Sequence, residues 1–418
     1  MHRPEDSVID VGALLEKVEA AAPIDAVEVV AAELGRMVDA TAVTLLIADF
    51  SGRAVVRIPA VEAVPEQVQG QSETLLLAGT RYGEVIRTQQ ADVQAIGDGA
   101  RMLAPVTDRG DAIGLLELDL PRYPSPDEVS DICAAAHALA YVVIAARRHT
   151  DVFEWGQRST PFALAAEIQR RLLPASYTCE AGQFTLAGWL EPASSVGGDT
   201  FDYTLDRDIL QLSITDAVGH HVAAALLATL LVGALRNGRR RGLDLAAQAR
   251  FANDALAQNA AAGQFVTGQV LHVDLHTGAA SIVNAGHTLP LRLRNGRVEE
   301  VPLRVEPPFG VLPGKDFVVQ SFPLEPGDRV IFLTDGMQER NAASFDVAAA
   351  LADSVDLHPR EVVHELGAAV LRATGGDLRD DATMVCLDWY GGPPRGRATE
   401  FGADPDRASA PASGARRY

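Results

Sequence analysis

The chain has 418 residues, more than one ordinary hydrophobic core holds, so two domains with tails are expected. Its 47% hydrophobic and 22% charged residues are typical of a folded globular protein and exclude a disordered or collagen-like chain. The formal net charge is −20, and no dense Lys/Arg tract offsets it, which argues against nucleic acid or an anionic membrane surface as a partner.

Cysteine usage and the apolar runs indicate the compartment. Cys133, Cys179 and Cys386 show no CxxC or Cys/His spacing, which favours a reducing compartment and argues against zinc or a disulfide framework. The N-terminus has no apolar signal-peptide region. The most apolar runs, 132–146 and 222–235, are about 15 residues long, shorter than a bilayer span requires. We therefore expect a cytoplasmic protein.

The N-terminal part predicts a compact α+β unit over residues 23–149, preceded by a helical segment within residues 1–22. AVEVVAAELGRMV predicts a helix that leads into the β-branched stretch TAVTLLIAD and a hairpin turn at Ser51-Gly52. A second hairpin is expected to turn at 108–111, where Gly110 allows a tight turn. A long helix with apolar residues at helical spacing follows, up to residue 148.

This order of elements, with the stretch APVTDRGDAIGLLEL, resembles a GAF domain, the sensor module of many signalling proteins. The resemblance covers about residues 24–148. GAF domains bind cyclic nucleotides, tetrapyrroles or other small molecules, or only dimerise, so a small-molecule ligand is expected as one alternative. His137 is interpreted as a packed imidazole rather than a cofactor ligand.

A connecting helix is expected within residues 150–175, because Leu164, Ile168 and Leu172 recur four residues apart. Over residues 176–390 the predicted strands come in groups, with helices at 222–237, 243–259 and 359–374, which favours α+β layering over βαβ alternation. Residues 391–418 are rich in Gly, Pro, Ala and Ser, which predicts a disordered tail.

Acidic residues adjoin four predicted strands of the second unit. They are Asp199 in VGGD, Asp216 in ITDAVGHH, Asp335 in FLTDG, and Asp380 with Asp381 in RDDATMV. One such aspartate is most often a turn residue, but four together suggest a shared site. Two carboxylates about 4 Å apart repel by roughly 4 kcal/mol at an effective dielectric constant near 20, so protons or divalent cations must relieve the repulsion.

Oxygen donors without His or Cys at ligand spacing favour hard cations, so two Mn²⁺ or Mg²⁺ ions are the expected cofactors. Two such ions would polarise a phosphoryl oxygen and make hydroxide available near neutral pH. Gly197, Gly198, Gly219 and Gly336 are expected to let backbone carbonyls and a substrate phosphate approach the metals without a Cβ in the way.

In chain order, the motifs IQRRLLP, VGGDxFD, DxxGH, NAGH, PPFGVLPG, TDGxxE and DDxT resemble the SpoIIE/RsbU branch of the PPM-type metal-dependent serine/threonine phosphatases. The resemblance covers about residues 169–389. It implies two central antiparallel sheets flanked by helix pairs and two bound Mn²⁺ or Mg²⁺ ions. It also implies hydrolysis of phosphoserine or phosphothreonine, often on small STAS-domain anti-anti-sigma proteins.

The resemblance also implies roles for single residues, matched motif by motif. The implied metal-binding positions are Asp199, Asp216, Asp335, Asp380 and the backbone carbonyl of Ala217. Asp381 and Asp202 are expected to support these ligands from behind. Glu339 and Thr383 match the pattern and either share in the site or tie loops together.

Two departures from the family pattern concern histidines and prolines. The usual GHG is Gly219-His220-His221 here, so a bulky side chain replaces a glycine, and His221 either narrows access or lies on the helix surface. NAGH is followed by Thr288-Leu289-Pro290 where two prolines are common. His220 is the candidate general acid, with a structural role at the helix N-terminus as the alternative.

The sequence is thus interpreted as a GAF-like sensor that controls, through the helix at 162–173, a phosphatase acting on a phosphoserine protein. A homodimer is expected through helices at 8–20 and 127–148, whose apolar faces need cover. Two alternatives stay open: a catalytically silent phosphatase-fold scaffold that binds a regulatory partner, and a two-metal hydrolase of small phosphate esters.

Overall fold

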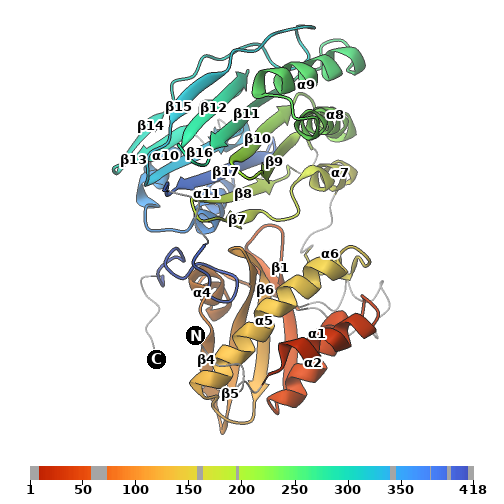
Figure 1. The fold of residues 1–418 in the computed structure, drawn as a ribbon, viewed down its shortest axis with the longest axis vertical. Helices are drawn as coiled ribbons and strands as arrows, with labels where there is room; N and C mark the ends of the chain where they lie inside the picture. The colour runs from red at the N-terminus through yellow and green to blue at the C-terminus, as the bar shows by residue number, and fades with distance from the viewer. Residues whose placement is uncertain are drawn as a thin grey trace. The chain divides into compact units, whose positions relative to one another are not determined.

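The chain folds into two compact units in the computed structural model, which describes residues 9–57, 73–157, 163–193, 197–338, 345–376, 378–392 and 397–412. One unit comprises Met1–Pro161 together with Ala398–Tyr418, and the other comprises Phe162–Arg397. Figure 1 shows the helices and strands of each unit. The discontinuous first unit was not expected from the sequence.

The N-terminal unit is built on a six-stranded antiparallel sheet in the order β3-β2-β1-β6-β5-β4. Figure 1 labels β1, β6, β5 and β4 of this sheet. Its strands are β1 (Ala42–Ala48), β2 (Ala54–Arg57), β3 (Thr74–Leu76), β4 (Asp92–Ile96), β5 (Gly99–Asp108) and β6 (Asp111–Leu120). Side chains alternate between the two faces of a strand, so Leu45 and Ile47 of β1 enter one core and Leu46 enters the other.

Helices cover both faces of this sheet. The first core receives α1 (Val11–Ala20), α2 (Ala26–Met37), α5 (Pro126–Ala146) and α6 (Val152–Gly156), and the second receives α4 (Arg81–Thr88). Ser125 and Glu128 form a capping box that begins α5, with Pro126 at the first helical position. The arrangement supplies the predicted α+β unit with a core on each side of its sheet.

The predicted turn between β5 and β6 is confirmed. Arg109 has φ of 46° and Gly110 has φ of 76°, so both central residues adopt the left-handed conformation that a two-residue hairpin turn needs. Asp108 pairs with Asp111 across the turn. The glycine at the second position therefore marks the hairpin as the sequence predicted.

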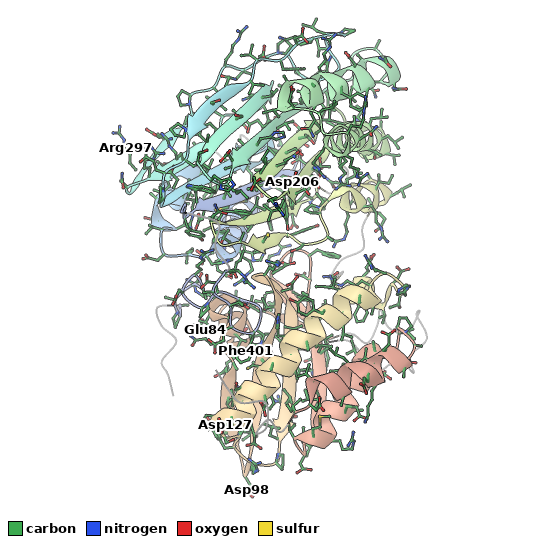
Figure 2. The ribbon with its side chains drawn as sticks, viewed as in Figure 1. Glu84, Asp98, Asp127, Asp206, Arg297 and Phe401 are labelled. Atoms are coloured by element: carbon green, nitrogen blue, oxygen red, sulfur yellow. The ribbon has the colours of Figure 1, made fainter. Side chains whose placement is uncertain are left out.

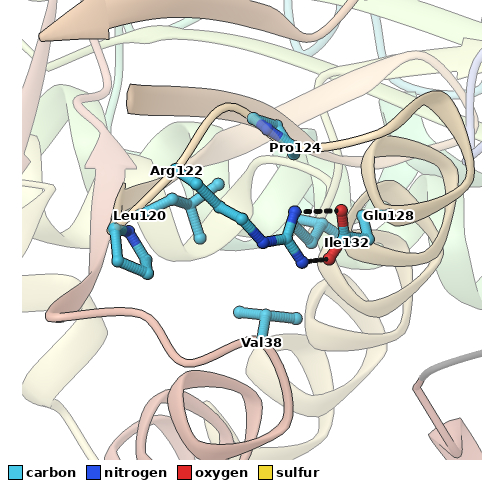
Figure 3. A pocket seen from close by; sticks show the side chains of 7 residues that line it. Val38, Leu120, Arg122, Pro124, Glu128 and Ile132 are labelled. Carbon is cyan, nitrogen blue, oxygen red and sulfur yellow. Dashed lines mark hydrogen bonds and ion pairs between the residues drawn. The ribbon is translucent and has the colours of Figure 1, made fainter. Parts of the chain in front are cut away.

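A small hollow of this unit lies among Val38, Leu120 and Ile132 (Figure 3). The Arg122–Glu128 ion pair crosses it, with Arg122 Nη1 2.8 Å from Glu128 Oε2 and Nη2 2.5 Å from Oε1. The guanidinium holds the pKa of Glu128 down at about 2, helped by a hydrogen bond from the Ser125 backbone. The hollow is a packing feature where α2, β6 and α5 meet.

Residues 397–412 do not form the disordered tail that their composition predicted. Residues 398–412 lie against the N-terminal unit, where Gly110 N donates to Gly402 O at 3.0 Å and Arg87 Nε donates to Ala410 O at 2.9 Å. Asp404 is buried. Figure 2 labels Phe401 in this segment. The prediction failed because small residues dock by close backbone approach, without the apolar periodicity that marks an ordered element.

The C-terminal unit contains two antiparallel sheets (Figure 1). The first has the order β15-β12-β11-β10-β9, with β9 (Asp199–Leu205), β10 (Ile209–Ala217), β11 (Val266–Asp274), β12 (Ala279–Ala285) and β15 (Gln320–Pro323). The second has the order β14-β13-β16-β17-β8-β7, with β7 (Thr178–Glu180), β8 (Phe184–Glu191), β13 (Leu291–Arg294), β14 (Arg297–Glu300), β16 (Asp328–Leu333) and β17 (Ala382–Trp389).

Three cores stack these sheets and their helices into four layers. The central core joins the sheets through side chains such as Phe201 and Phe332. A second core packs α8 (His221–Arg240) and α9 (Leu245–Asn259) on the first sheet, and a third packs α10 (Val347–Asp353) and α11 (Pro359–Ala373) on the second. This is the sandwich of two sheets flanked by helix pairs that the resemblance implied.

Two apolar helices of the described residues are longer than the sequence predicted. Within the described residues, α5 and α8 are 21 and 20 residues long, so by length and composition alone each is sufficient to cross a bilayer. The expectation that the apolar runs are too short is therefore wrong, because each helix extends beyond its run. The most apolar windows are 61% and 50% buried inside the fold, as in the core helices of globular proteins.

The connecting helix predicted around Leu164, Ile168 and Leu172 is present as α7 (Leu164–Leu172), and a separate helix, α6, precedes it. The face that α7 buries differs from the predicted apolar stripe. On α7 the buried residues are Ala165, Ala166 and Gln169, while Leu164 is 66% exposed. The helix thus turns its small residues and one amide inward, because it packs closely against a neighbouring loop and helix.

Candidate metal centre

The first two predicted ligands face each other across neighbouring strands. In the antiparallel pair β9 and β10, Asp199 is the partner of Asp216, and Thr267 of β11 is the partner of Asp216 on its other side. Asp199 and Phe201 are two residues apart and share a face, and Phe201 belongs to the core between the sheets. The two carboxylates therefore lie where that core ends.

The second sheet contributes the other predicted ligands from β16 and β17, which pair with each other. Asp335 follows β16 at the start of the 3-10 helix η1 (Asp335–Gln338), and Asp380 precedes β17. Thr334 joins the sheets, because its Oγ1 donates to Asp199 Oδ2 at 2.7 Å and its N donates to Thr383 O at 3.0 Å. Strand ends far apart in sequence thus meet at one edge.

Asp381 is held by a dense set of donors. Its Oδ1 accepts a hydrogen bond from Ala193 N at 2.8 Å. Its Oδ2 accepts from Gln169 Nε2 at 2.7 Å, Gly198 N at 3.0 Å and Asp199 N at 3.3 Å. With both oxygens used in this way, the carboxylate anchors the backbone that carries Asp199, in keeping with the supporting role expected for it.

The carboxylates act on one another electrostatically. Burial raises the pKa of Asp199 well above its usual value, and the charges of Asp216 and Asp381 raise it further. Burial also raises the pKa of Asp216 to about 7, and the charges of Asp335, Asp380 and Asp381 add to that effect. All four predicted ligands therefore contribute to one region of negative potential.

The side-chain positions do not by themselves form a coordination sphere. Within the described residues, no three His, Cys, Asp or Glu side chains are spaced to hold a metal ion, and the Asp335 side chain is exposed. The chemistry of the donors nevertheless fits a hard divalent cation, because all of them are oxygens and a bound cation would offset the burial and the like charges that raise the pKa values of Asp199 and Asp216.

At Gly198 and Gly336 a backbone carbonyl comes close to the glycine, as was expected of these positions. A Cβ on Gly198 would lie 2.6 Å from Ala217 O, and one on Gly336 would lie 1.9 Å from Asp381 O. The carbonyl of Ala217, the predicted backbone ligand, thus lies against the loop that carries Asp199. No side chain fits between these backbones, so both positions require glycine.

Asp202 does not support the metal centre as expected. Its odd offset from Asp199 places it on the opposite face of β9. It accepts from Arg236 Nε at 3.1 Å and Nη2 at 2.9 Å, and from Arg239 Nη1 at 3.1 Å. Asp202 therefore ties β9 to α8 through both Arg236 and Arg239.

His220 and His221 begin α8, where both are exposed. Their rings pack edge to face, with centroids 4.4 Å apart. His221 has φ of 61°, in the left-handed region that favours glycine, which gives a physical reason for the family's glycine at this position. Of the two interpretations of His221, the structure supports a place on the helix surface.

The NAGH motif is a closed turn beside the site. His287 N donates to Asn284 Oδ1 at 2.8 Å, and Asn284 Nδ2 donates to His287 O at 3.1 Å. The ring Nδ1 of His287 lies 2.9 Å from Oγ1 of Thr267, the neighbour of Asp216. Burial lowers the pKa of His287 to about 4, so the imidazole is neutral near pH 7. Glu339 lies outside the described residues.

Sequence reasoning gave no role to Gln169 or Thr334, although both contact the site directly. The signal for Gln169 was its position in IQRRLLP, one of the matched motifs, but nothing in the sequence says which way it points. Thr334 directly precedes Asp335, and its sequence position is typical of an ordinary residue at the end of a strand. Only the fold brings these two side chains to Asp199.

Residues 206–390 match the family model of stage II sporulation protein E (SpoIIE). The C-terminal half carries a SpoIIE/RsbU-like phosphatase domain. The chain is 22% identical over 237 residues to phosphoserine phosphatase RsbU of Bacillus subtilis, covering 54% of this chain and 68% of RsbU.

Two further proteins are similar to part of this chain. The chain is 26% identical to protein IcfG of Synechocystis over 201 residues. The alignment covers 41% of this chain and 32% of IcfG, so this chain spans about a third of the length of IcfG. The structure of the PP2C phosphatase domain and a regulatory fragment of Bacillus subtilis SpoIIE aligns with a TM-score of 0.44 and 20% identity, covering 51% of this chain and 66% of that one.

Proposed function

We propose that the SpoIIE-like domain is a metal-dependent protein serine/threonine phosphatase. The observation that carries the proposal is the facing pair Asp199 and Asp216, whose pKa values are raised by burial and further by the charges of neighbouring aspartates. The proposed ligands of two Mn²⁺ or Mg²⁺ ions are Asp199, Asp216, Asp335, Asp380 and the carbonyl of Ala217. The SpoIIE family match and the likeness to RsbU support the same activity.

The chain's own residues prepare the site for this chemistry. Bound cations would neutralise the carboxylates, polarise the phosphoryl oxygen and lower the pKa of a bound water. Asp381 fixes the loop before Asp199 through its hydrogen bonds, and Thr334 orients Asp199 Oδ2. His220, exposed four residues after Asp216, is our candidate donor of a proton to the serine leaving oxygen.

The proposed substrate is a phosphoserine or phosphothreonine protein, with a small STAS-domain regulator as the expected partner. RsbU is by name a phosphoserine phosphatase, which supports this substrate class. Comparing kcat/KM for a phosphorylated STAS-domain protein with that for nucleotides and small phosphate esters tests it. A preference for the small esters would instead favour the two-metal esterase alternative.

Hydrolysis of a generic aryl phosphate by the full chain is the direct test. We expect turnover that requires Mn²⁺, stops with a chelator and falls at least about 100-fold in Asp216→Asn. Asp206→Asn, in the exposed turn between β9 and β10, is the control and is expected to leave the rate unchanged. Mn²⁺ binding without hydrolysis of any phosphoester would identify a silent scaffold.

The N-terminal unit is proposed to be a GAF-like sensor that regulates the phosphatase through α7. Its antiparallel sheet with helices on both faces supports this, as does the contact of Gln169 with the proposed site. Charging the helix with Ile168→Glu is expected to abolish the response of hydrolysis to whichever small molecule the sensor binds. An unchanged response would refute the route through α7.

A cytoplasmic homodimer is the proposed state of the protein. Exposed apolar side chains on α1 and α5 support dimerisation, among them Leu15, Tyr141 and Ile144. Light scattering of the wild type and of Tyr141→Glu tests this, since the variant is expected to be monomeric. Cys133, Cys179 and Cys386, all among the described residues, form no disulfide with one another, which supports a reducing compartment.

A further inference from the structure

We propose that Gln169 of α7 is a positioning residue for the metal centre. Its amide holds the main chain of Asp199 and the carboxylate of Asp381 at a fixed separation, and through them the direction of the Asp199 carboxylate. The inference rests on the proposed function and adds to it a residue outside the predicted ligand set.

The amide of Gln169 lies between the two groups that it joins. The side chain is buried, with 1% of the residue exposed. Its Nε2 donates one hydrogen bond to Asp199 O at 2.8 Å and another to Asp381 Oδ2 at 2.7 Å. Both N–H bonds of a single nitrogen are therefore used, each on a different segment of the site.

The rest of α7 packs on the same loop. A Cβ on Gly197 would lie 2.8 Å from the Cβ of Ala165, so helix and loop are in close contact there. Ala165 and Gln169 are one helical turn apart and share a face. The helix therefore holds the Gly197–Asp199 loop at two successive points, first by close packing and then by hydrogen bonds.

A buried amide lowers stability compared with an apolar side chain of the same size, unless its hydrogen bonds are made. Among the residues that the structure describes, the Oε1 of Gln169 is buried and has no hydrogen-bond partner, and a buried polar atom without a partner opposes folding. Gln248 of α9 shows the contrasting case, because its Nε2 donates to Leu235 O at 2.9 Å and its Oε1 lies 3.2 Å from His272 Nε2. We infer that Gln169 is placed for its two donors.

Titration of the full-length protein with Mn²⁺ alone, followed by calorimetry, tests the proposal. Gln169→Met keeps the length of the side chain and removes both donors, and we expect it to weaken Mn²⁺ binding about tenfold, the lower end of the effect of residues that orient metal ligands. Gln248→Met removes an equally buried amide away from the site and is expected to leave the Kd for Mn²⁺ within about twofold.

Thermal unfolding without metal separates positioning from folding. Both variants are expected to lower Tm to a similar extent, so a selective loss of Mn²⁺ affinity in Gln169→Met supports positioning. Should Gln169→Met not fold, Gln169→Asn takes its place, because its shorter side chain cannot reach both acceptors. A variant at Gln169 that folds and binds Mn²⁺ as the wild type does, or no worse than Gln248→Met, would overturn the inference.

The outcomes also separate this inference from the proposed function. Wild-type protein that binds no Mn²⁺ would refute the proposed metal centre, and the inference with it. Wild-type binding that survives unchanged in the Gln169 variants would refute the inference alone and leave the phosphatase proposal intact.

Discussion

The carboxylate of Asp216, when ionised, opposes the folding of the metal-free protein. Its carboxylate lies among the charges of Asp335, Asp380 and Asp381, and its pKa in the folded protein is about 7. In the unfolded chain an aspartate titrates near pH 3.9. The contribution of Asp216 to the stability of the metal-free protein is thus fully present below about pH 4 and is lost as the pH rises through about 7, because ionised Asp216 is favoured in the unfolded chain.

Asp216→Asn is therefore expected to stabilise the metal-free protein at pH 8. Removing the ionisable group removes the penalty, and a gain of about 1 kcal/mol would raise Tm by roughly 2–4 °C. Thermal unfolding of chelator-treated protein between pH 5 and 8 measures it, with Asp206→Asn as the control. A variant less stable than the wild type at pH 8 would contradict the electrostatic account.

His221 has the backbone conformation of a glycine. We expect His221→Gly to stabilise the protein by up to about 1 kcal/mol, because glycine has no Cβ to strain at φ of 61°. Ala223→Gly, exposed in the same helix, is the matched control and should destabilise by about 1 kcal/mol. Urea unfolding of the three proteins decides, and a loss of stability in His221→Gly would count against backbone strain.

At the scale of elements, the two faces of β9 serve different purposes. Asp199 and Phe201 face the second sheet, whereas Asp202 faces α8 and pairs there with Arg236 and Arg239. Motif matching grouped Asp199 and Asp202 together because they lie three residues apart. The alternation of side chains along a strand separates them, one for the site and one for packing a helix onto the sheet.

Asp202→Ala is expected to lower the free energy of unfolding by about 3 kcal/mol, because it leaves two partly buried guanidinium groups without their carboxylate. The Kd for Mn²⁺ should not change. Chemical denaturation and Mn²⁺ titration together measure both quantities, with Asp206→Ala as the control. Loss of Mn²⁺ affinity beyond that of the control would restore the role near the metal that the sequence suggested.

At the scale of the whole molecule, the C-terminal segment makes the N-terminal unit discontinuous. The chain leaves this unit to form the SpoIIE-like domain and then returns to it with residues 398–412. Ala412 N donates to Glu84 Oε1 at 3.1 Å, and both Glu84 and Phe401 are labelled in Figure 2. The stability of the N-terminal unit thus depends on residues at the far end of the chain.

Truncation after Arg397 is expected to lower the Tm of the N-terminal unit by several degrees while leaving that of the SpoIIE-like domain unchanged. The reason is that the deletion removes the hydrogen bonds made to Gly110 and Arg87. Differential scanning calorimetry follows both transitions, and added Mn²⁺ identifies the second by raising its Tm. Truncation after Ala412 is the control; equal effects of the two deletions would refute docking of 398–412.

Much of the fold was predictable because local patterns carry it. Helices at 222–237, 243–259 and 359–374 were expected within a few residues of α8, α9 and α11, since their apolar residues recur at helical spacing. β9 was not predicted as a strand, because Asp199 and Asp202 oppose strand formation locally. Its pairing with β10 outweighs that preference. The buried face of α7 was also predicted wrongly, because the apolar stripe was expected to be buried and Leu164 of that stripe is exposed.

The sequence alone determined which residues are candidates for the site. Residue type and order in the motifs select Asp199, Asp216, Asp335 and Asp380, because chemistry depends on functional groups that can be read directly. Only the tertiary structure decided that Asp202 serves α8, that Gln169 joins Asp199 to Asp381, and that residues 398–412 complete the N-terminal unit. Those contacts join residues far apart in the chain, so they depend on strand register and packing, which no local pattern records.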